Sequence, residues 1–518
     1  MRKKWSLRKK VWLLFLVGNL LPVCYVLWMC FGPPTAIEIS EETTYLTEPL
    51  TDDGQYIDYL AYGKKVIGEH DYADDLWKAM VSPDRPHDES SEWALSRVPD
   101  VSFRDPEVKP EAETYEQSNN RQQRDTARCY SPFNAGIDKH YATVTRANEP
   151  WYEAVMAIEP GPVGVEWSSQ LFGTVLPISD VHGKLRRRFQ LRLSLAFGEG
   201  DFEKALESFR FVQRVAARER TILFSMTQHV GQRHSSRAIT AACQGILAAE
   251  DIPDKILRDF DTFRLPANLM DQWLKAIEMD HLSWLQEIQS EHQSRGQLGE
   301  FCNYERGFGK VGANWFTHRT DFSSAMRLAN NRFRQSKPAF AMTNSCQSIA
   351  RLKQIDAAFR KANPSPSHAN DEPSIWNLAT ADYSSWLRHM VNTQGPSLVY
   401  ARQQLARYEN SLRRLRLTIR LHVYRKRHGV WATSLDELNS LDGWVADKDI
   451  LTDSFSSKPL RYVRTDKGFV LYSVGPNGKD ETDIETVYDL ETLESLSTVD
   501  DELWPWPDPR YVWSPKEQ

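Results

Sequence analysis

Twenty-one consecutive residues near the N-terminus, Val11 to Phe31, carry no charged side chain. With about 1.5 Å of rise per residue, a helix of this length spans roughly 30 Å, the thickness of the hydrocarbon core of a bilayer. The alternative is a cleaved signal peptide, whose apolar region is shorter and ends in small residues. Here the run leads into Gly32, Pro33 and Pro34. We therefore predict an uncleaved transmembrane helix over residues 11–31.

The charges around this run predict its orientation. No Lys or Arg follows the run until Lys64. Six basic residues precede it: Arg2, Lys3, Lys4, Arg8, Lys9 and Lys10. The positive-inside rule places residues 1–10 in the cytoplasm and everything after the span on the other side. The chain has no Asn-x-Ser/Thr acceptor for glycans, which favours a bacterial envelope. We expect a single-pass signal-anchor protein of the cell inner membrane with a periplasmic bulk.

The rest of the chain has the composition of a water-soluble protein. Mean hydropathy is −0.54, with 26% charged residues. A net charge of −6 gives no overall field that attracts nucleic acid, so we expect no nucleic-acid partner. Four cysteines follow the span: Cys129, Cys243, Cys302 and Cys346. In an oxidising compartment they allow up to two disulfides in three pairings, and the spacing does not choose between them.

Residues 32–150 are polar and weakly periodic, and are predicted to form a linker and an N-terminal extracytoplasmic segment. Within them, Asp52-Asp53-Gly54 is typical of a turn, and Ile57, Leu60 and Ala61 follow with helical spacing. The phrase Thr47 to Leu50, with Gly54 and Asp58-Tyr59, resembles the opening of a family of uncharacterised membrane-anchored proteins of planctomycete-type bacteria. That family implies no activity.

Residues 151–400 are predicted to form a helical domain. Apolar residues recur at steps of three and four on both sides of the break Gly198-Glu199-Gly200-Asp201, which predicts a helix, a tight turn and a second helix. The phrase Gly200 to Phe209 resembles the second half of a tetratricopeptide repeat. No 34-residue period recurs, so a generic helical hairpin is the preferred interpretation.

A long helix opens the region 401–492. Its apolar stripe consists of Leu405, Tyr408, Leu412, Leu415, Ile419 and Val423. Its basic residues are Arg402, Arg407, Arg413, Arg414, Arg416, Arg420, Arg425, Lys426 and Arg427. A basic face of this kind can meet an acidic partner or lipid headgroups. A solvated face or internal pairing with the chain's acidic residues is the more common use of such charges.

After His428-Gly429, a helix stop, Leu435 to Leu438 is predicted as a short helix capped by Thr433 or Ser434. Residues 460–463 and 468–474 are predicted as two strands, giving a small α+β unit with the long helix packed on the sheet. The long helix, the Ser434 to Leu438 phrase, Asp453 with Phe455, and Leu471 to Ile484 resemble the globular domain of the major pseudopilins of type II secretion. Some 370 residues separate this pseudopilin-like module from the membrane span, so we expect a reused domain that does not polymerise as a pilin.

The resemblance to pseudopilins implies a calcium ion in the loop after the second strand. Asn477, Asp480 and Asp483 are the side chains that match. A turn-rich loop of carboxylate and amide oxygens suits a hard cation, although the paired glycines of the pseudopilin loop are replaced around Glu481-Thr482. The alternative is an acidic surface turn. Residues 493–518 form a tail rich in Trp and Pro.

The motifs of common enzymes are missing: there is no Gly-rich phosphate loop ending in Lys-Ser/Thr, no Gly-x-Ser-x-Gly and no His-Glu-x-x-His. The sequence predicts no catalytic residue. We predict a mainly α protein, with one transmembrane helix, a large helical extracytoplasmic domain and the small α+β module. Its expected role is that of a non-enzymatic scaffold or interaction protein that binds another envelope protein. The alternative is an envelope hydrolase whose carboxylates converge only in the fold.

Overall fold

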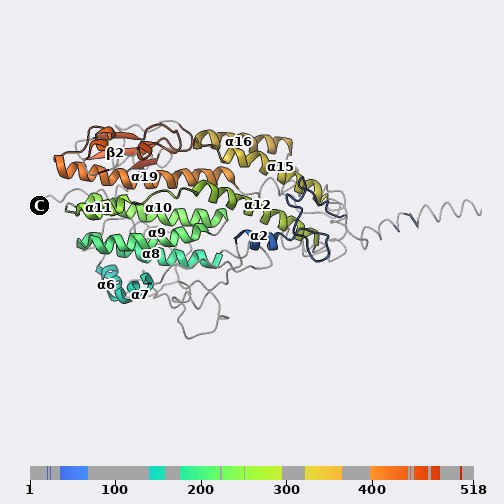
Figure 1. Ribbon diagram of the computed structural model, residues 1–518, viewed down its shortest axis with the longest axis horizontal. Coiled ribbons are helices and arrows are strands. Elements are labelled where there is room, and N and C mark those ends of the chain that lie inside the picture. The colour runs from blue at the N-terminus through green and yellow to red at the C-terminus, as the bar shows by residue number, and fades with distance from the viewer. Residues whose placement is uncertain are drawn as a thin grey trace, which may run out of the picture. The chain divides into compact units, whose positions relative to one another are not determined.

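The computed structural model describes residues 20, 21, 24, 36–67, 139–157, 176–221, 224–249, 251–293, 321–363, 397–441, 444, 448–464, 468–478 and 502–504. These residues are mainly helical, as predicted (Figure 1). Two compact units are present. Unit 1 comprises Met1–Val66, Glu278–Lys337 and Gln354–Pro396, and unit 2 comprises Ile67–Ile277, Pro338–Lys353 and Ser397–Gln518.

The predicted membrane span, residues 11–31, lies outside the described residues except for Leu20, Leu21 and Cys24. Within the part of the chain that is described, no helix combines the length and the apolar character needed to cross a bilayer.

The turn that the sequence predicts at Asp52-Asp53-Gly54 is present in unit 1. Asp53 Oδ1 accepts hydrogen bonds from Thr51 Oγ1 (2.7 Å) and from the backbone N–H of Gln55 (3.0 Å). Gly54 has φ of +68°, a left-handed conformation that glycine adopts without steric cost. Helix α2 (Tyr59–Ile67) follows, which confirms the predicted turn and helix.

The N-terminal segment of unit 1 packs on the later helices α12 (Leu269–Gln293) and α15 (Phe322–Phe340). The side-chain amide of Gln289 accepts from the backbone N–H of Ile57 (3.1 Å) and donates to its carbonyl (2.8 Å). These two bonds satisfy both backbone groups of a buried residue. Residues 36–66 are therefore part of a folded unit.

A buried histidine reinforces this packing. The His281 ring stacks on Phe333 with 4.2 Å between ring centroids, and its Nε2 lies 2.6 Å from Asn330 Oδ1. The amide group of Asn330 then donates to the carbonyl of Thr43 (2.7 Å). Burial lowers the pKa of His281 to about 4, so the ring is neutral at physiological pH and serves as a packing group.

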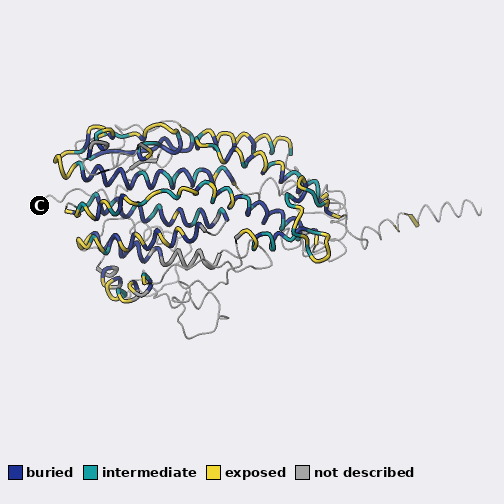
Figure 2. The backbone as a smooth tube through the Cα atoms, viewed as in Figure 1, coloured by how far each residue is buried: buried dark blue, intermediate teal, exposed yellow. Residues whose placement is uncertain are grey.

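Unit 2 is built on four long helices in sequential layers: α8 (Leu176–Glu199), α9 (Phe202–Thr221), α10 (Ser225–Ala248) and α19 (Leu398–His428). Helix α9 packs against α8 and α10, and α10 packs against α19 (Figure 1). The shorter helices α6 (Lys139–Ala147), α7 (Glu149–Met156) and α11 (Asp254–Asp261) add to these layers, and α16 (Ser345–Ala362) begins in this unit. Figure 2 shows how far the long helices are buried.

The α8–α9 hairpin has the predicted form. Its turn is made by Gly200, with φ of +74°, and by Asp201, whose Oδ1 accepts from the backbone N–H of Lys204 (3.1 Å) and caps α9. The buried apolar face of α9 follows steps of three and four, and contains Ala205, Leu206, Phe209, Val212, Val215 and Ala216. The predicted helix, turn and helix are confirmed.

Helix α10 approaches α9 at a glycine. A Cβ atom on Gly231 would lie 2.7 Å from the carbonyl oxygen of Ala216 and 3.1 Å from Cβ of Glu219. The first of these atoms belongs to the backbone of α9, so it cannot move away by a change of rotamer. The absence of a side chain at this position therefore sets the distance between the two helices.

We expect Gly231→Ala to lower the free energy of unfolding by about 1–3 kcal/mol, because the two helices must separate to admit the methyl group. Alanine gains about 1 kcal/mol over glycine in helix propensity, so the measured loss is the clash minus this gain. Urea denaturation of the full-length protein in detergent measures the difference. The control is Gly468→Ala, where a Cβ meets nothing within 4 Å, and a destabilisation at Gly468 equal to that at Gly231 would refute the steric explanation.

The C-terminal part of unit 2 contains the predicted strands. Strands β1 (Arg461–Arg464) and β2 (Phe469–Ser473) pair antiparallel, with Tyr462 opposite Leu471. A third strand that the sequence analysis did not predict, β3 (Glu502–Trp504), pairs antiparallel with β2 and comes from the Trp- and Pro-rich tail. The sheet order is β1-β2-β3.

The predicted short helix is present as the 3₁₀ helix η3 (Leu435–Ser440), and a second one, η4 (Lys448–Leu451), follows. Ser434 is at the N-cap position of η3 but makes no side-chain cap bond. Instead the carboxylate of Glu437 accepts hydrogen bonds from the backbone N–H (3.2 Å) and the hydroxyl of Thr433. Of the two predicted caps, only Thr433 is engaged. The Thr433 hydroxyl donates to the side chain of Glu437 and does not bond to the backbone of η3.

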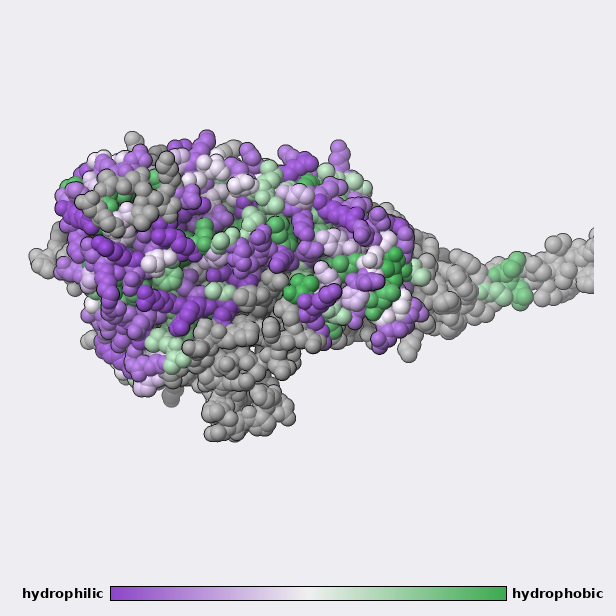
Figure 3. All heavy atoms as spheres, viewed as in Figure 1, coloured by the Kyte–Doolittle hydropathy of each residue, from purple (hydrophilic) through white to green (hydrophobic). Residues whose placement is uncertain are grey.

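The described part of the visible face of unit 2 is mainly hydrophilic, and its apolar residues form small separate areas (Figure 3). Among the described residues of this unit, the exposed large hydrophobic side chains are Tyr400 and Val430. Scattered residues of this kind are normal on a water-facing surface. A functional site on unit 2 is therefore better sought in a cleft than on an apolar patch.

Candidate binding cleft

A cleft of about 940 Å³ lies in unit 2, lined from α7, α8, α9 and α19 and from the segment after α11. Six of its lining residues are basic and three are acidic: Arg192, Lys204, Arg210, Arg214, Arg220 and Arg264, with Glu149, Glu153 and Glu207. The other lining residues are Met156, Ala157, Gln213, Ala217, Phe263, Tyr408 and Leu412. This volume is in the range of small-molecule sites.

One face of α9 provides a whole wall of the cleft. The lining residues of this helix recur at steps of three and four: Lys204, Glu207, Arg210, Gln213, Arg214, Ala217 and Arg220. Residues with this spacing share one side of an α-helix. The opposite side of α9 carries the apolar residues of the core, so the polar wall follows directly from the amphipathic sequence of the helix.

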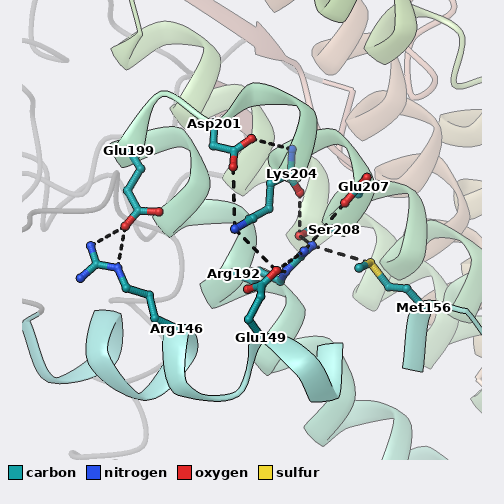
Figure 4. A network of polar contacts seen from close by, with 9 residues as sticks. All are labelled: Arg146, Glu149, Met156, Arg192, Glu199, Asp201, Lys204, Glu207 and Ser208. Atoms are coloured by element: carbon teal, nitrogen blue, oxygen red, sulfur yellow. Dashed lines mark hydrogen bonds and ion pairs between the residues drawn. The ribbon is translucent and has the colours of Figure 1, made fainter. Parts of the chain in front are cut away.

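Arg192 of α8 organises one part of the cleft (Figure 4). Its side chain is only 2% exposed. Its Nη1 donates to Ser208 Oγ (2.8 Å), while Nε (3.1 Å) and Nη2 both donate to Glu149 Oε1. Because Glu149 comes from the short helix α7, this charged pair fixes α7 against α8 and α9. The carboxylate of Glu149 is thereby bound to a guanidinium.

Lys204 joins the same network from the first turn of α9 (Figure 4). Its Nζ lies 3.6 Å from Glu149 Oε1 and 3.7 Å from Asp201 Oδ2. Arg146 of α6 pairs with Glu199 at the end of α8. These partly exposed pairs contribute little stability individually. The contacts of Glu149 with Arg192 and Lys204 make one end of the cleft a set of mutually compensated charges.

Two of the remaining basic side chains have carboxylate partners outside the lining. Arg210 Nη2 lies 3.2 Å from Asp259 Oδ2, and Arg264 Nη2 lies 3.5 Å from Asp261 Oδ2. Arg214 and Arg220 differ, because no carboxylate of the described residues forms an ion pair with either of them. The cleft therefore has an excess of positive charge on the second half of α9.

Arg220 is the more deeply buried of these two arginines. The residue is 5% exposed, and its Nη1 is a buried atom with no hydrogen-bond partner among the described residues. Its guanidinium lies over the ring of Tyr408, 5.3 Å from the centroid, which gives a cation–π contact. A buried cation without a counter-ion is unusual, because its transfer from water is strongly unfavourable.

The sequence-predicted calcium ligands lie elsewhere. Asn477 is in the turn that follows β2, between Gly475 and Gly478, both of which have positive φ. Asp480 and Asp483 lie outside the described residues. In the described ranges, no three His, Cys, Asp or Glu side chains are grouped as ligands of a metal ion.

His234, His229, Cys243 and Cys346 contact other protein groups and, among the residues that the structure describes, are not arranged as a catalytic or metal site. Nδ1 of His234 lies 2.8 Å from Glu219 Oε2, and both side chains are buried. His229 is packed against Tyr400. Cys243 and Cys346 are free thiols, whereas Cys129 and Cys302 lie outside the described residues. The pairing of Cys243 with Cys346 is not present.

Four of the arginines on α19 are not on a solvated basic face. Arg402, Arg414, Arg416 and Arg420 are all buried. Arg416 Nε lies 3.2 Å from Asp261 Oδ1, and Arg402 Nη2 donates to the carbonyl of Met342 (2.9 Å). Of the alternatives for this helix, internal pairing with an acidic residue describes Arg416 and Arg420, which both lie beside Asp261, whereas Arg402 bonds to a backbone carbonyl. The exposed basic residues are near its end and include Arg425, Lys426 and Arg427.

The basic wall of α9 was missed by the sequence analysis. The signal was available, because Arg210, Arg214 and Arg220 follow helical spacing on the side opposite to the apolar residues. The sequence predicts a basic face on α19 instead, because that helix carries more Arg and Lys residues. Nothing local in the sequence indicates that Tyr408 and Phe263 complete the cleft, since they are distant along the chain.

Comparison with models of known protein families, with curated proteins and with solved structures finds no match for this chain.

Proposed function

We propose that this chain is a single-pass protein of a bacterial inner membrane that acts outside the cytoplasm by binding. In this proposal, residues 1–10 are cytoplasmic, residues 11–31 span the bilayer, and the parts of units 1 and 2 that follow residue 31 are periplasmic. The support is the charge-free run flanked by cations on one side only, because moving those cations across a bilayer is unfavourable.

The cleft of unit 2 is the observation that carries the binding role. It combines a volume of about 940 Å³ with an excess of basic side chains. Its best-placed carboxylate, Glu149, accepts hydrogen bonds from Arg192 and also lies 3.6 Å from Lys204 Nζ. A carboxylate oxygen that already binds a guanidinium in this way is engaged in holding the fold together, which favours a structural role over a catalytic one.

The competing class is a hydrolase whose carboxylates converge in the fold. Glu149, Glu153 and Glu207 do line one cleft, which is the observation in favour of that class. Glu207 Oε2 lies 3.8 Å from the same guanidinium that holds Glu149. Because two of the three carboxylates are oriented toward Arg192, we favour binding.

We also propose that α19 with β1 and β2 is a pseudopilin-like module reused for contact with another envelope protein. The order of the elements and the hydrogen bonds between Asn410 of α19, Asp453 and Ser473 of β2 support it. This part of the proposal does not depend on the cleft.

Calcium binding at Asn477, Asp480 and Asp483 remains part of the proposal. We expect the melting temperature of the full-length protein to fall by several degrees when a chelator removes calcium, since a ligand that binds only the folded state stabilises it. Thermal melts with and without chelator measure the shift. The control is the double variant Asp480→Asn with Asp483→Asn, which should not respond. An unchanged melt of the parent protein would rule out the site.

The topology is tested by fusing alkaline phosphatase after residue 60 in a bacterial host. The enzyme is active only when exported, so we expect an active fusion. A matched fusion in which Arg2, Lys3, Lys4, Arg8, Lys9 and Lys10 are replaced by neutral residues should lose this orientation preference. An inactive parent fusion would disprove the proposed topology.

A further inference from the structure

We propose that the cleft of unit 2 binds a small ligand that carries an oxyanion group on an apolar body, with Arg220 and Arg214 as its charge partners. This inference rests on the proposed binding function and names the class of ligand. The first step is the charge on α9. Arg214 and Arg220 line the cleft, and no carboxylate of the described part of the chain pairs with either of them, so both guanidinium groups can receive an anion.

The second step is the state of Arg220. Its side chain is held away from water, yet Nη1 has no acceptor among the described residues. The face of Tyr408, 5.3 Å from the guanidinium carbon, compensates only part of the lost hydration. A planar guanidinium matches the geometry of carboxylate and phosphate oxygens, and its contact with them is strengthened by the charges. An incoming oxyanion satisfies the buried donor.

The third step is the apolar part of the lining. Phe263, Tyr408, Leu412 and Met156 share the cleft with the arginines, and Ala217 lies between Arg214 and Arg220 on α9. Because Ala217 is exposed and small, it leaves space on the wall between the two cations. The lining therefore favours a ligand with an aromatic or aliphatic body beside its charged group.

The fourth step concerns the acidic residues of the lining. Glu153 and Glu207 are both exposed and face the same cleft. They repel an extended polyanion, such as a nucleic-acid strand, whose phosphates would have to pass them. A compact ligand with one anionic group avoids this repulsion. The charge pattern thus favours a small acid over a polymer.

The test measures binding of phenyl phosphate and of benzoate to the full-length protein in detergent by isothermal titration calorimetry. We expect at least one of the two acids to bind, with the tighter one identifying the head group. Arg214→Gln should weaken binding roughly tenfold, the usual effect of one charge-assisted hydrogen bond. Ala217→Leu should abolish binding, because it fills the space between the arginines while keeping a good helix former at an exposed position.

Two controls separate this site from general charge effects. Arg258→Gln removes an exposed arginine of α11 that does not line the cleft, and it should leave binding unchanged. Benzyl alcohol, which has the apolar body without the charge, should bind at least tenfold more weakly than the acids. Failure of both acids to bind, or binding that Arg214→Gln and Ala217→Leu leave intact, overturns the inference. If the phosphatase fusion is active but neither acid binds, the proposed membrane topology stands and only the proposed ligand class is rejected.

Discussion

Asp453→Ala is expected to lower the free energy of unfolding by about 3–5 kcal/mol, because this carboxylate holds five hydrogen bonds in the interior. Asp453 is 1% exposed. Its Oδ1 accepts from Asn410 Nδ2 (3.1 Å), Ser473 Oγ (2.8 Å) and the backbone N–H of Phe455 (2.9 Å). Its Oδ2 accepts from Ser456 Oγ (2.9 Å) and the backbone N–H of Val474 (3.3 Å).

The loss is large because alanine leaves several buried donors without an acceptor, and each such group costs about 1–3 kcal/mol. Chemical denaturation of the full-length protein in detergent measures it. The free energy of unfolding of Asp453→Asn should lie between those of the parent and of the alanine variant. One side-chain oxygen still accepts hydrogen bonds, but the new NH2 group faces donors and cannot accept from them. The matched control in the same module is the exposed Asp436→Ala, expected within about 0.5 kcal/mol of the parent. Equal effects at Asp436 and Asp453 would refute this account.

Asp261→Ala is expected to lower the free energy of unfolding by a similar amount, about 3–5 kcal/mol, since it removes the carboxylate that two buried arginines share. Asp261 ends α11 and lies 3.2 Å from Arg416 Nε and 3.8 Å from Arg420 Nη2. Both of these arginines are buried in α19. Removing the carboxylate leaves two charges of the same sign close together in a region with little water.

The control for this prediction is Asp259→Ala, two residues away on the same helix. Asp259 pairs with Arg210 at 3.2 Å, but both side chains are partly accessible to water, with 32% and 47% of their surface exposed. Exposed ion pairs contribute about 0–1 kcal/mol, so this variant should change stability little. Denaturation curves of both variants provide the comparison. If the two losses were equal, the burial of the Asp261 cluster would not explain its effect.

Local signals predicted the parts of the fold that depend on neighbouring residues. Helix α19 ends at the predicted position because Gly429, with φ of +72°, donates its N–H to the carbonyl of Arg425 (2.8 Å). The α8–α9 turn and strands β1 and β2 were predicted from equally local patterns. In each case a few adjacent residues decide the conformation, so the sequence contains the necessary information.

Long-range partners explain what the sequence analysis could not predict. Arg416 and Arg420 of α19 are paired inside the fold because Asp261, some 155 residues before Arg416, lies beside them. The same holds for the cleft, where Tyr408 of α19 approaches Arg220 of α9. Helical spacing can place residues on one side of a helix. It cannot identify which distant helix faces that side, and this determines whether a basic stripe is solvated, paired or part of a site.

Labelling of a cysteine at position 217 tests the central claim, a ligand-accessible cleft outside the cytoplasm, most directly. The Ala217→Cys variant is treated in spheroplasts with a maleimide that does not cross membranes, and labelling of the parent protein gives the background from its own thiols. We expect rapid labelling above this background, slowed by phenyl phosphate or benzoate. Labelling that appears only after the cells are lysed, or that neither acid slows, would contradict the account.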